Sequence, residues 1–188
     1  ATSLSSDVHA GIYVITVGTP LKDGHFNLDF IQAAAKEVAD NMQDGALIIL
    51  RAGPGLSVQD QGRPGLLDRG LSVGGAADQL ALAEGAALLG QDGALAALEM
   101  AGMGGEFEVT VPTRIALTGA PMRTTLDVAP LVWNASHALQ PGQRLSIGAA
   151  VTGVYGYLHL GGGLDLPVAM GARSAHLSAA IGTLIQDG

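Results

Sequence analysis

The sequence predicts an α+β chain in which a βαβ appendage, residues 1–50, precedes a β-rich domain, residues 51–188. Three observations lead to this prediction. Two apolar strand patterns flank an amphipathic helix pattern in the first fifty residues. After Glu106, short strand patterns recur with turns about every eight to twelve residues, which is typical of a sandwich or barrel. The composition also changes near residue 50.

The appendage is predicted from three segments. Residues 11–17 and 46–50 are β-branched or aliphatic runs typical of buried strands. Asn27 can cap a helix over residues 28–42, whose apolar positions fall on one face. The compositional change supports a boundary here, because both lysines precede residue 50 and all the arginines follow it.

The β-rich part contains one predicted helix, residues 76–89, ended by Gly90 and capped by Asp78. The glycine groups at 102–105 and 161–163 lack the strand–turn–helix setting of a nucleotide loop and are predicted to form turns or bulges. The expected strands are 107–111, 114–118, 124–128, 131–133, 144–147 and 154–160.

Composition excludes several classes of function. A formal net charge of -8 argues against binding to a nucleic-acid backbone or to anionic lipid. No apolar run reaches the ~18 residues of a membrane span, and no basic segment precedes the first apolar run as in a signal peptide. The absence of cysteine excludes a thiol nucleophile and zinc-thiolate sites. We expect a cytoplasmic protein that binds neither nucleic acid nor membrane.

Chemistry-bearing motifs are few. The sequence holds no Walker loop and no Gly-x-Ser-x-Gly elbow, and its five histidines are too scattered to predict a metal site. The densest polar cluster, residues 57–63, places Gln59, Asp60 and Arg63 between glycines. It indicates either an anion-binding loop or a structural Asp–Arg pair that holds a loop in place. Glu99, in an apolar run, is either exposed at a sheet edge or buried.

Residues 53–69, GPGLSVQDQGRPGLLDR, closely resemble the opening signature of the biotin-dependent carboxyltransferase family, which includes the C subunit of 5-oxoprolinase and allophanate hydrolase subunit 2. The likeness continues through residues 74–100, 114–121 and 158–177. The resemblance implies a cyclophilin-like fold built as two similar halves, of which residues 51–188 correspond to the first.

The resemblance also implies a function. The chain would be a subunit or fragment of an ATP-dependent 5-oxoprolinase or allophanate hydrolase-type enzyme that acts on amide C–N bonds of a small molecule with partner subunits. ATP or biotin would enter only through those partners. Two alternatives stay open: a non-catalytic interaction or regulatory module, and a recombined chain without evolved activity.

The resemblance also implies which residues form the site, because they occupy matching positions in the motifs. The resemblance assigns catalysis to Asp60, Arg63 and Asp78, and substrate binding to Gln59, Gly62 and Arg173. Glu99 and Gly171 also match the family pattern. The chain departs from that pattern at residues 74–78, at Glu84–Gly85 and at His176, where the family often has Asp.

Residues 13–50 resemble a different family, the nucleotide-sugar dehydrogenases of the UDP-glucose/GDP-mannose type. The segment lacks that family's glycine-rich first turn, and a chain without cysteine lacks its catalytic thiol. Dehydrogenase activity is therefore not expected. Two unrelated resemblances that meet at residues 46–52 indicate a chimera, in which the strand at 46–50 replaces the first strand of the β-rich domain.

A half domain would leave a sheet edge or an apolar face uncovered, and self-association would cover it. We therefore predict a homo-oligomer. Sedimentation or light scattering at micromolar concentration is expected to give a mass above 18.9 kDa. A strictly monomeric mass would contradict this prediction.

Overall fold

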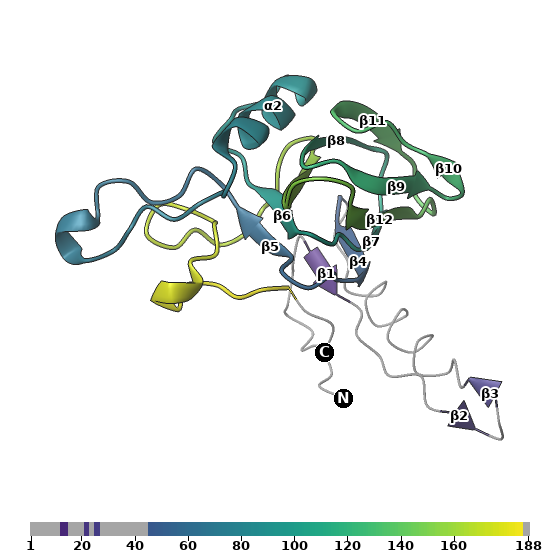
Figure 1. The fold of residues 1–188 in the computed structure, drawn as a ribbon, viewed down its shortest axis with the longest axis horizontal. Coiled ribbons are helices and arrows are strands. Elements are labelled where there is room, and N and C mark those ends of the chain that lie inside the picture. Colours follow the sequence, from purple (N-terminus) through teal and green to yellow (C-terminus); the bar gives the residue numbers. More distant parts are fainter. Residues whose placement is uncertain (1–11, 15–20, 23–24, 27–44, 186–188) are drawn as a thin grey trace.

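A computed structural model describes residues 12–14, 21–22, 25–26 and 45–185 (Figure 1). The helix predicted over residues 28–42 and its Asn27 cap lie outside these residues. The described part is mostly β and contains one α-helix, α2 (Gln79–Leu89), with two 3₁₀ turns, η1 (Leu67–Arg69) and η2 (Leu177–Ala179).

Two sheets form the body of the fold (Figure 1). The first has the order β1 (Ile12–Val14), β4 (Leu47–Arg51), β7 (Glu106–Val109), β12 (Leu145–Ala150), β9 (Met122–Leu126) and β10 (Ala129–Pro130). The second has the order β11 (Ala135–Leu139), β8 (Thr113–Gly119), β13 (Tyr155–Leu160), β6 (Ala97–Ala101) and β5 (Ser57–Gln59). A separate pair joins β2 (Leu21–Lys22) to β3 (His25–Phe26).

The strand pairings described in both sheets are antiparallel with one exception, the parallel pairing of β1 with β4. Its register places Ile12 opposite Leu47 and Val14 opposite Ile49. Parallel neighbours need a long crossover connection, and 32 residues separate Val14 from Leu47 (47 − 14 − 1). This pairing is the one a βαβ segment requires.

The core lies between the two sheets. In β4 and β7 the buried and less buried residues alternate, so one face of the first sheet carries the apolar side chains. Phe107 and Ile49 from that face belong to the same buried cluster as Leu98, Leu117 and Leu158 from the second sheet. Burial of this cluster provides the main driving force for folding.

The second sheet is covered on both faces. The central strands β6, β8 and β13 show nearly unbroken buried runs rather than alternation. Helix α2 lies over the outer face, where Ala81 and Leu82 pack with Ala97 and Tyr157 in a second apolar cluster. Because both faces of these strands are buried, their sequences are predominantly apolar runs rather than alternating apolar and polar residues.

Helix α2 confirms the predicted caps. The Asp78 carboxylate accepts a hydrogen bond from the Ala81 N–H at 3.0 Å, and Gly90 ends the helix in the left-handed region at φ 63°. The helix begins at Gln79 rather than at residue 76. The preceding N–H groups of Ala76 and Ala77 bond instead to Asp60 and Glu99, which draws residues 76–77 away from the helix.

The strand predictions hold for most of the second half, with corrections. Residues 131–133 form no strand, because they lie in the turn between β10 and β11, where Asn134 has φ 55°. Strand β11 follows that turn and was not predicted, nor were β5 and β6. The glycines at 161–163 lie at a turn, as predicted, whereas residues 102–105 form an irregular connection between β6 and β7; φ is 75° at Gly102 and 87° at Gly162.

Helix and sheet come into close contact at Gly85. A Cβ atom added there would lie 2.1 Å from Nε2 of His159, a buried residue of β13. That imidazole is 3.0 Å from the Thr118 hydroxyl, which donates to the Ala81 carbonyl of α2 at 2.8 Å. Burial lowers the pKa of His159 to about 4, so the ring is neutral at pH 7. Glycine at 85 is therefore required for this packing.

We predict that Gly85→Ala lowers the free energy of unfolding by about 2 kcal/mol, because overpacking against a buried ring exceeds the roughly 1 kcal/mol gained from helix propensity. Urea denaturation measures this change. Gly93→Ala is the matched control, because its Cβ would meet only Gln61 Nε2 at 3.6 Å. Equal stability of the two variants would contradict the packing argument.

Candidate functional site

The predicted site residues converge where two loops meet beside β5. The first loop follows β5 and runs to α2, and the second spans residues 166–176 after β13; both project from one end of the sheets (Figure 1). The Ala175 N–H donates to the Val58 carbonyl at 2.9 Å, which aligns the second loop with β5. Side chains of the first loop then fix the remainder of the second.

Asp60 binds backbone on both loops. Its Oδ1 accepts the N–H of Gly62 at 2.9 Å, and its Oδ2 accepts the N–H of Arg173 at 2.6 Å. Its own carbonyl accepts the Ala76 N–H at 2.9 Å. Because both carboxylate oxygens are engaged with backbone donors, the geometry favours orientation over proton transfer as the role of Asp60.

Arg63 is 2% exposed, and its guanidinium binds the second loop. Nε donates to the Ala169 carbonyl at 2.9 Å, Nη1 to the Ser174 hydroxyl at 3.0 Å, and Nη2 to the Ser174 carbonyl at 2.6 Å. Within the described residues Arg63 forms no ion pair with Asp60, so the two side chains hold the loops separately rather than as an Asp–Arg pair. The catalytic role assigned to Arg63 by resemblance stays a prediction.

Arg173 differs from Arg63 in its available donors. Its Nε donates to the Leu166 carbonyl at 2.9 Å, while its Nη atoms bind no other residue that the structure describes. The side chain is half-buried. The neighbouring Gly171 and the carboxylate-bearing Asp60 both line a cavity of about 270 Å³. Of Arg63 and Arg173, it is Arg173 whose two Nη atoms both lack a hydrogen-bond partner among the described residues.

The remaining predicted acids lie beside this junction. Asp78 caps α2, so its carboxylate is directed to the helix rather than to the cavity. Glu99 is buried: its Oε2 accepts the Tyr157 hydroxyl at 2.6 Å and the Ala77 N–H at 2.7 Å. Burial and the bond to Glu99 raise the pKa of Tyr157 well above its usual value, so the hydroxyl remains a donor.

Sequence reasoning missed polar contacts of Tyr157 and His176. The Tyr157–Glu99 bond joins strands 58 residues apart and leaves no local signal. The exposed Ser72 lies 3.0 Å, Oγ to Nε2, from the buried His176, and a Cβ on Gly74 would lie 3.2 Å from Nδ1 of that imidazole. The only sequence feature that pointed to either residue was His176 itself, which stands where the resemblance leads us to expect Asp.

Two buried polar atoms near the junction have no hydrogen-bond partner among the described residues, Gln59 Oε1 and His176 Nδ1. Gln59 Nε2 donates to the Ser57 hydroxyl at 3.0 Å and lies 3.4 Å from the Ala175 carbonyl. Buried polar atoms are seldom unpaired in native proteins. Within the described part of the chain, Gln59 Oε1 is therefore an unpaired acceptor inside the protein, and the binding role assigned to Gln59 stays a prediction.

Within the described residues, no cluster of three or more His, Asp or Glu side chains could hold a metal ion. In that part of the chain, no helix has the length and apolar character needed to cross a membrane.

Comparison with known proteins identifies the family. Residues 69–188 match the model of the carboxyltransferase domain, subdomain A and B. The chain belongs to this carboxyltransferase family. It is 38% identical over 149 residues to the C subunit of 5-oxoprolinase from Escherichia coli, an alignment that covers 76% of the chain and 47% of the relative.

Solved structures share the fold of this chain. A crystal structure of TTHA0988 superimposes with a TM-score of 0.73 at 25% identity, covering 78% of the chain and 30% of that protein. The urea amidolyase of Kluyveromyces lactis gives 0.67 at 28% identity, covering 79% of the chain and 9% of that protein. The chain spans about half the length of the curated 5-oxoprolinase relatives it matches.

We predict that Arg63→Met lowers the free energy of unfolding by about 3 kcal/mol, because it leaves buried carbonyls of the second loop without donors. Chemical denaturation and the rate of proteolysis within residues 166–176 measure the effect. Arg123→Met is the control, since Arg123 is exposed on β9 and its side chain makes no hydrogen bond or ion pair with a described residue. A loss no larger than that of Arg123→Met would contradict the structural role.

Proposed function

We propose that the chain contributes the first half of a carboxyltransferase-type subunit that acts on amide C–N bonds of a small molecule, in an ATP-dependent 5-oxoprolinase or allophanate hydrolase-type enzyme. The family match and the names of the relatives, 5-oxoprolinase and urea amidolyase, support this reaction class. Partner subunits would supply ATP or biotin, since this sequence carries no phosphate-binding Walker loop.

The observation that carries the proposal is that Asp60 and Gly62 line one cavity and that the Asp60 carboxylate binds the backbone N–H of Arg173 beside it. The available Nη atoms of Arg173 suit a carboxylate or carbamate, which a guanidinium binds bidentately. Asp60 would hold the Arg173 backbone in place through the hydrogen bond from its N–H. Arg63 would act as a positioning residue, because it fixes the loop that bears Arg173.

The interaction-module alternative predicts a broad apolar surface without converging charges. The loops do expose apolar side chains, since Leu67 is 69% and Met170 65% exposed. Yet Asp60 lines a cavity and binds the backbone of Arg173, whose Nη atoms have no partner among the described residues, and these contacts support the enzyme hypothesis.

The test is ATP-dependent release of glutamate from 5-oxoproline by the full chain mixed with complete partner subunits of a 5-oxoprolinase. An intact family subunit serves as the positive control. Turnover by the chain is the expected result. No turnover from a chain shown to be folded by circular dichroism would overturn the enzyme proposal and favour the interaction module.

In that assay we expect Arg173→Gln to lower kcat/KM at least tenfold, mainly through KM, because the variant loses the charged donors for the substrate carboxylate. Arg123→Gln, a substitution of an exposed arginine on β9, should retain the activity of the unmodified chain. Unchanged kinetics of Arg173→Gln would remove Arg173 from the substrate site.

A further inference from the structure

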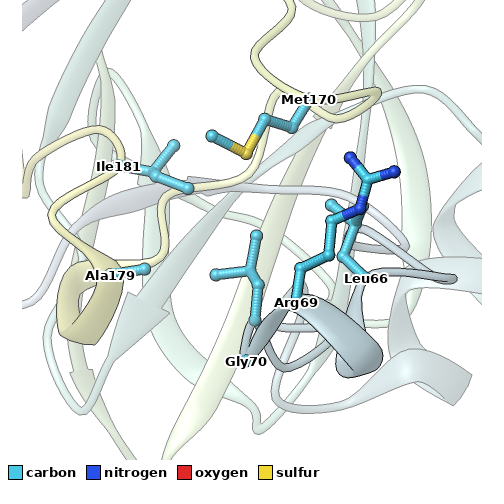
Figure 2. Close-up of a pocket in the computed structure, with 7 residues that line it drawn as sticks. Leu66, Arg69, Gly70, Met170, Ala179 and Ile181 are labelled. Atoms are coloured by element: carbon cyan, nitrogen blue, oxygen red, sulfur yellow. The ribbon is translucent and has the colours of Figure 1, made fainter.

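A second pocket is formed by the first loop, by Met170 of the second loop and by the segment that follows it, residues 179–181. It has a volume of about 650 Å³ and lies between η1 and the segment around η2. Figure 2 shows its side chains around a common space, with Arg69 rising from η1 and with Met170 and Ile181 opposite. The pocket is lined by Leu66, Arg69, Gly70, Leu71, Met170, Ala179 and Ile181. None of the described residues that line the smaller cavity at Asp60 contributes to this pocket.

The lining combines apolar walls with one cation. Leu66, Leu71, Met170 and Ile181 supply the apolar surface, and Arg69 is the only charged residue among the described residues that line the pocket. The Arg69 side chain forms no hydrogen bond or ion pair with any residue that the structure describes. In a chain of net charge -8, an arginine that has no carboxylate partner among the described residues and lies beside apolar walls favours an anionic ligand with an apolar body.

Backbone strain around the pocket is a separate observation. Four non-glycine residues among those described have positive φ: Asp127, Asn134, Met170 and Ala180. Asp and Asn tolerate that region, whereas Met and Ala disfavour it. Met170 lines the pocket, and Ala180 lies between the lining residues Ala179 and Ile181.

The Met170 conformation follows from a tight turn. Ala169 and Ala172 form a bridge, in which the Ala169 N–H donates to the Ala172 carbonyl at 2.9 Å, and Met170 and Gly171 connect them with φ 53° and 87°. Turns with two positive φ angles favour Asn-Gly. A methionine at the first position keeps a flexible apolar side chain at the pocket, and such strained positions concentrate at ligand clamps.

We propose that this pocket binds a small organic carboxylate with an aliphatic tail. Arg69 pairs with the carboxylate, and Leu71, Met170 and Ile181 contact the tail. The site is separate from the Asp60 cavity, so it does not rest on the proposed enzymatic function.

The test is isothermal titration of the full chain with sodium octanoate, with neutral 1-octanol as the matched ligand. Octanoate is expected to bind saturably and at least tenfold more tightly than octanol. Arg69→Gln should weaken octanoate binding at least tenfold while leaving octanol binding unchanged. Arg123→Gln should bind octanoate like the unmodified chain.

Met170→Asn separates binding from folding. Asparagine suits the left-handed backbone of the turn, so the melting temperature should not fall, while octanoate binding should weaken severalfold because the apolar contact is lost. Absence of saturable octanoate binding by the folded chain would overturn the proposal. Equal affinity for octanol, or undiminished affinity in Arg69→Gln, would do so as well.

Discussion

The junction of the two loops depends on one buried cation. The Arg63 guanidinium lies inside the protein and donates to carbonyl and hydroxyl oxygens of residues 169–174, which are more than a hundred positions away. Desolvating a guanidinium is unfavourable unless its N–H groups find acceptors, so the second loop must adopt the shape that supplies them. The cavity at Asp60 and the larger pocket at Arg69 both take walls from loops fixed in this way.

The three arginines of this region illustrate how burial separates roles within one residue type. Arg63 is buried and engaged with the second loop, Arg173 is half-buried with its Nη atoms available, and Arg69 is exposed at a pocket margin. Sequence similarity alone does not distinguish a buried arginine from an exposed one. The hydrogen-bond partners show that the buried one holds the loops, while the other two have donors available for ligands.

Helix α2 is held against the second sheet at two places. Its N-terminus is bound to the sheet through Ala77, Asp78 and the Glu99–Tyr157 pair, and its middle approaches β13 at Gly85. The glycine at 85 is required here because His159 fills the space that a side chain would take.

The sequence alone determined the β-rich class, the caps of α2 at Asp78 and Gly90, the turn glycines and the carboxyltransferase family, because these depend on local propensity or on motif order. It did not predict strands β5, β6 and β11, since β5 has only three residues, β6 is buried on both faces and shows no alternation, and β11 follows an irregular turn. Tertiary structure decided which polar side chains meet. The contacts of Asp60 and Arg63 with residues 169–174 join distant segments, and no local pattern encodes such long-range pairings.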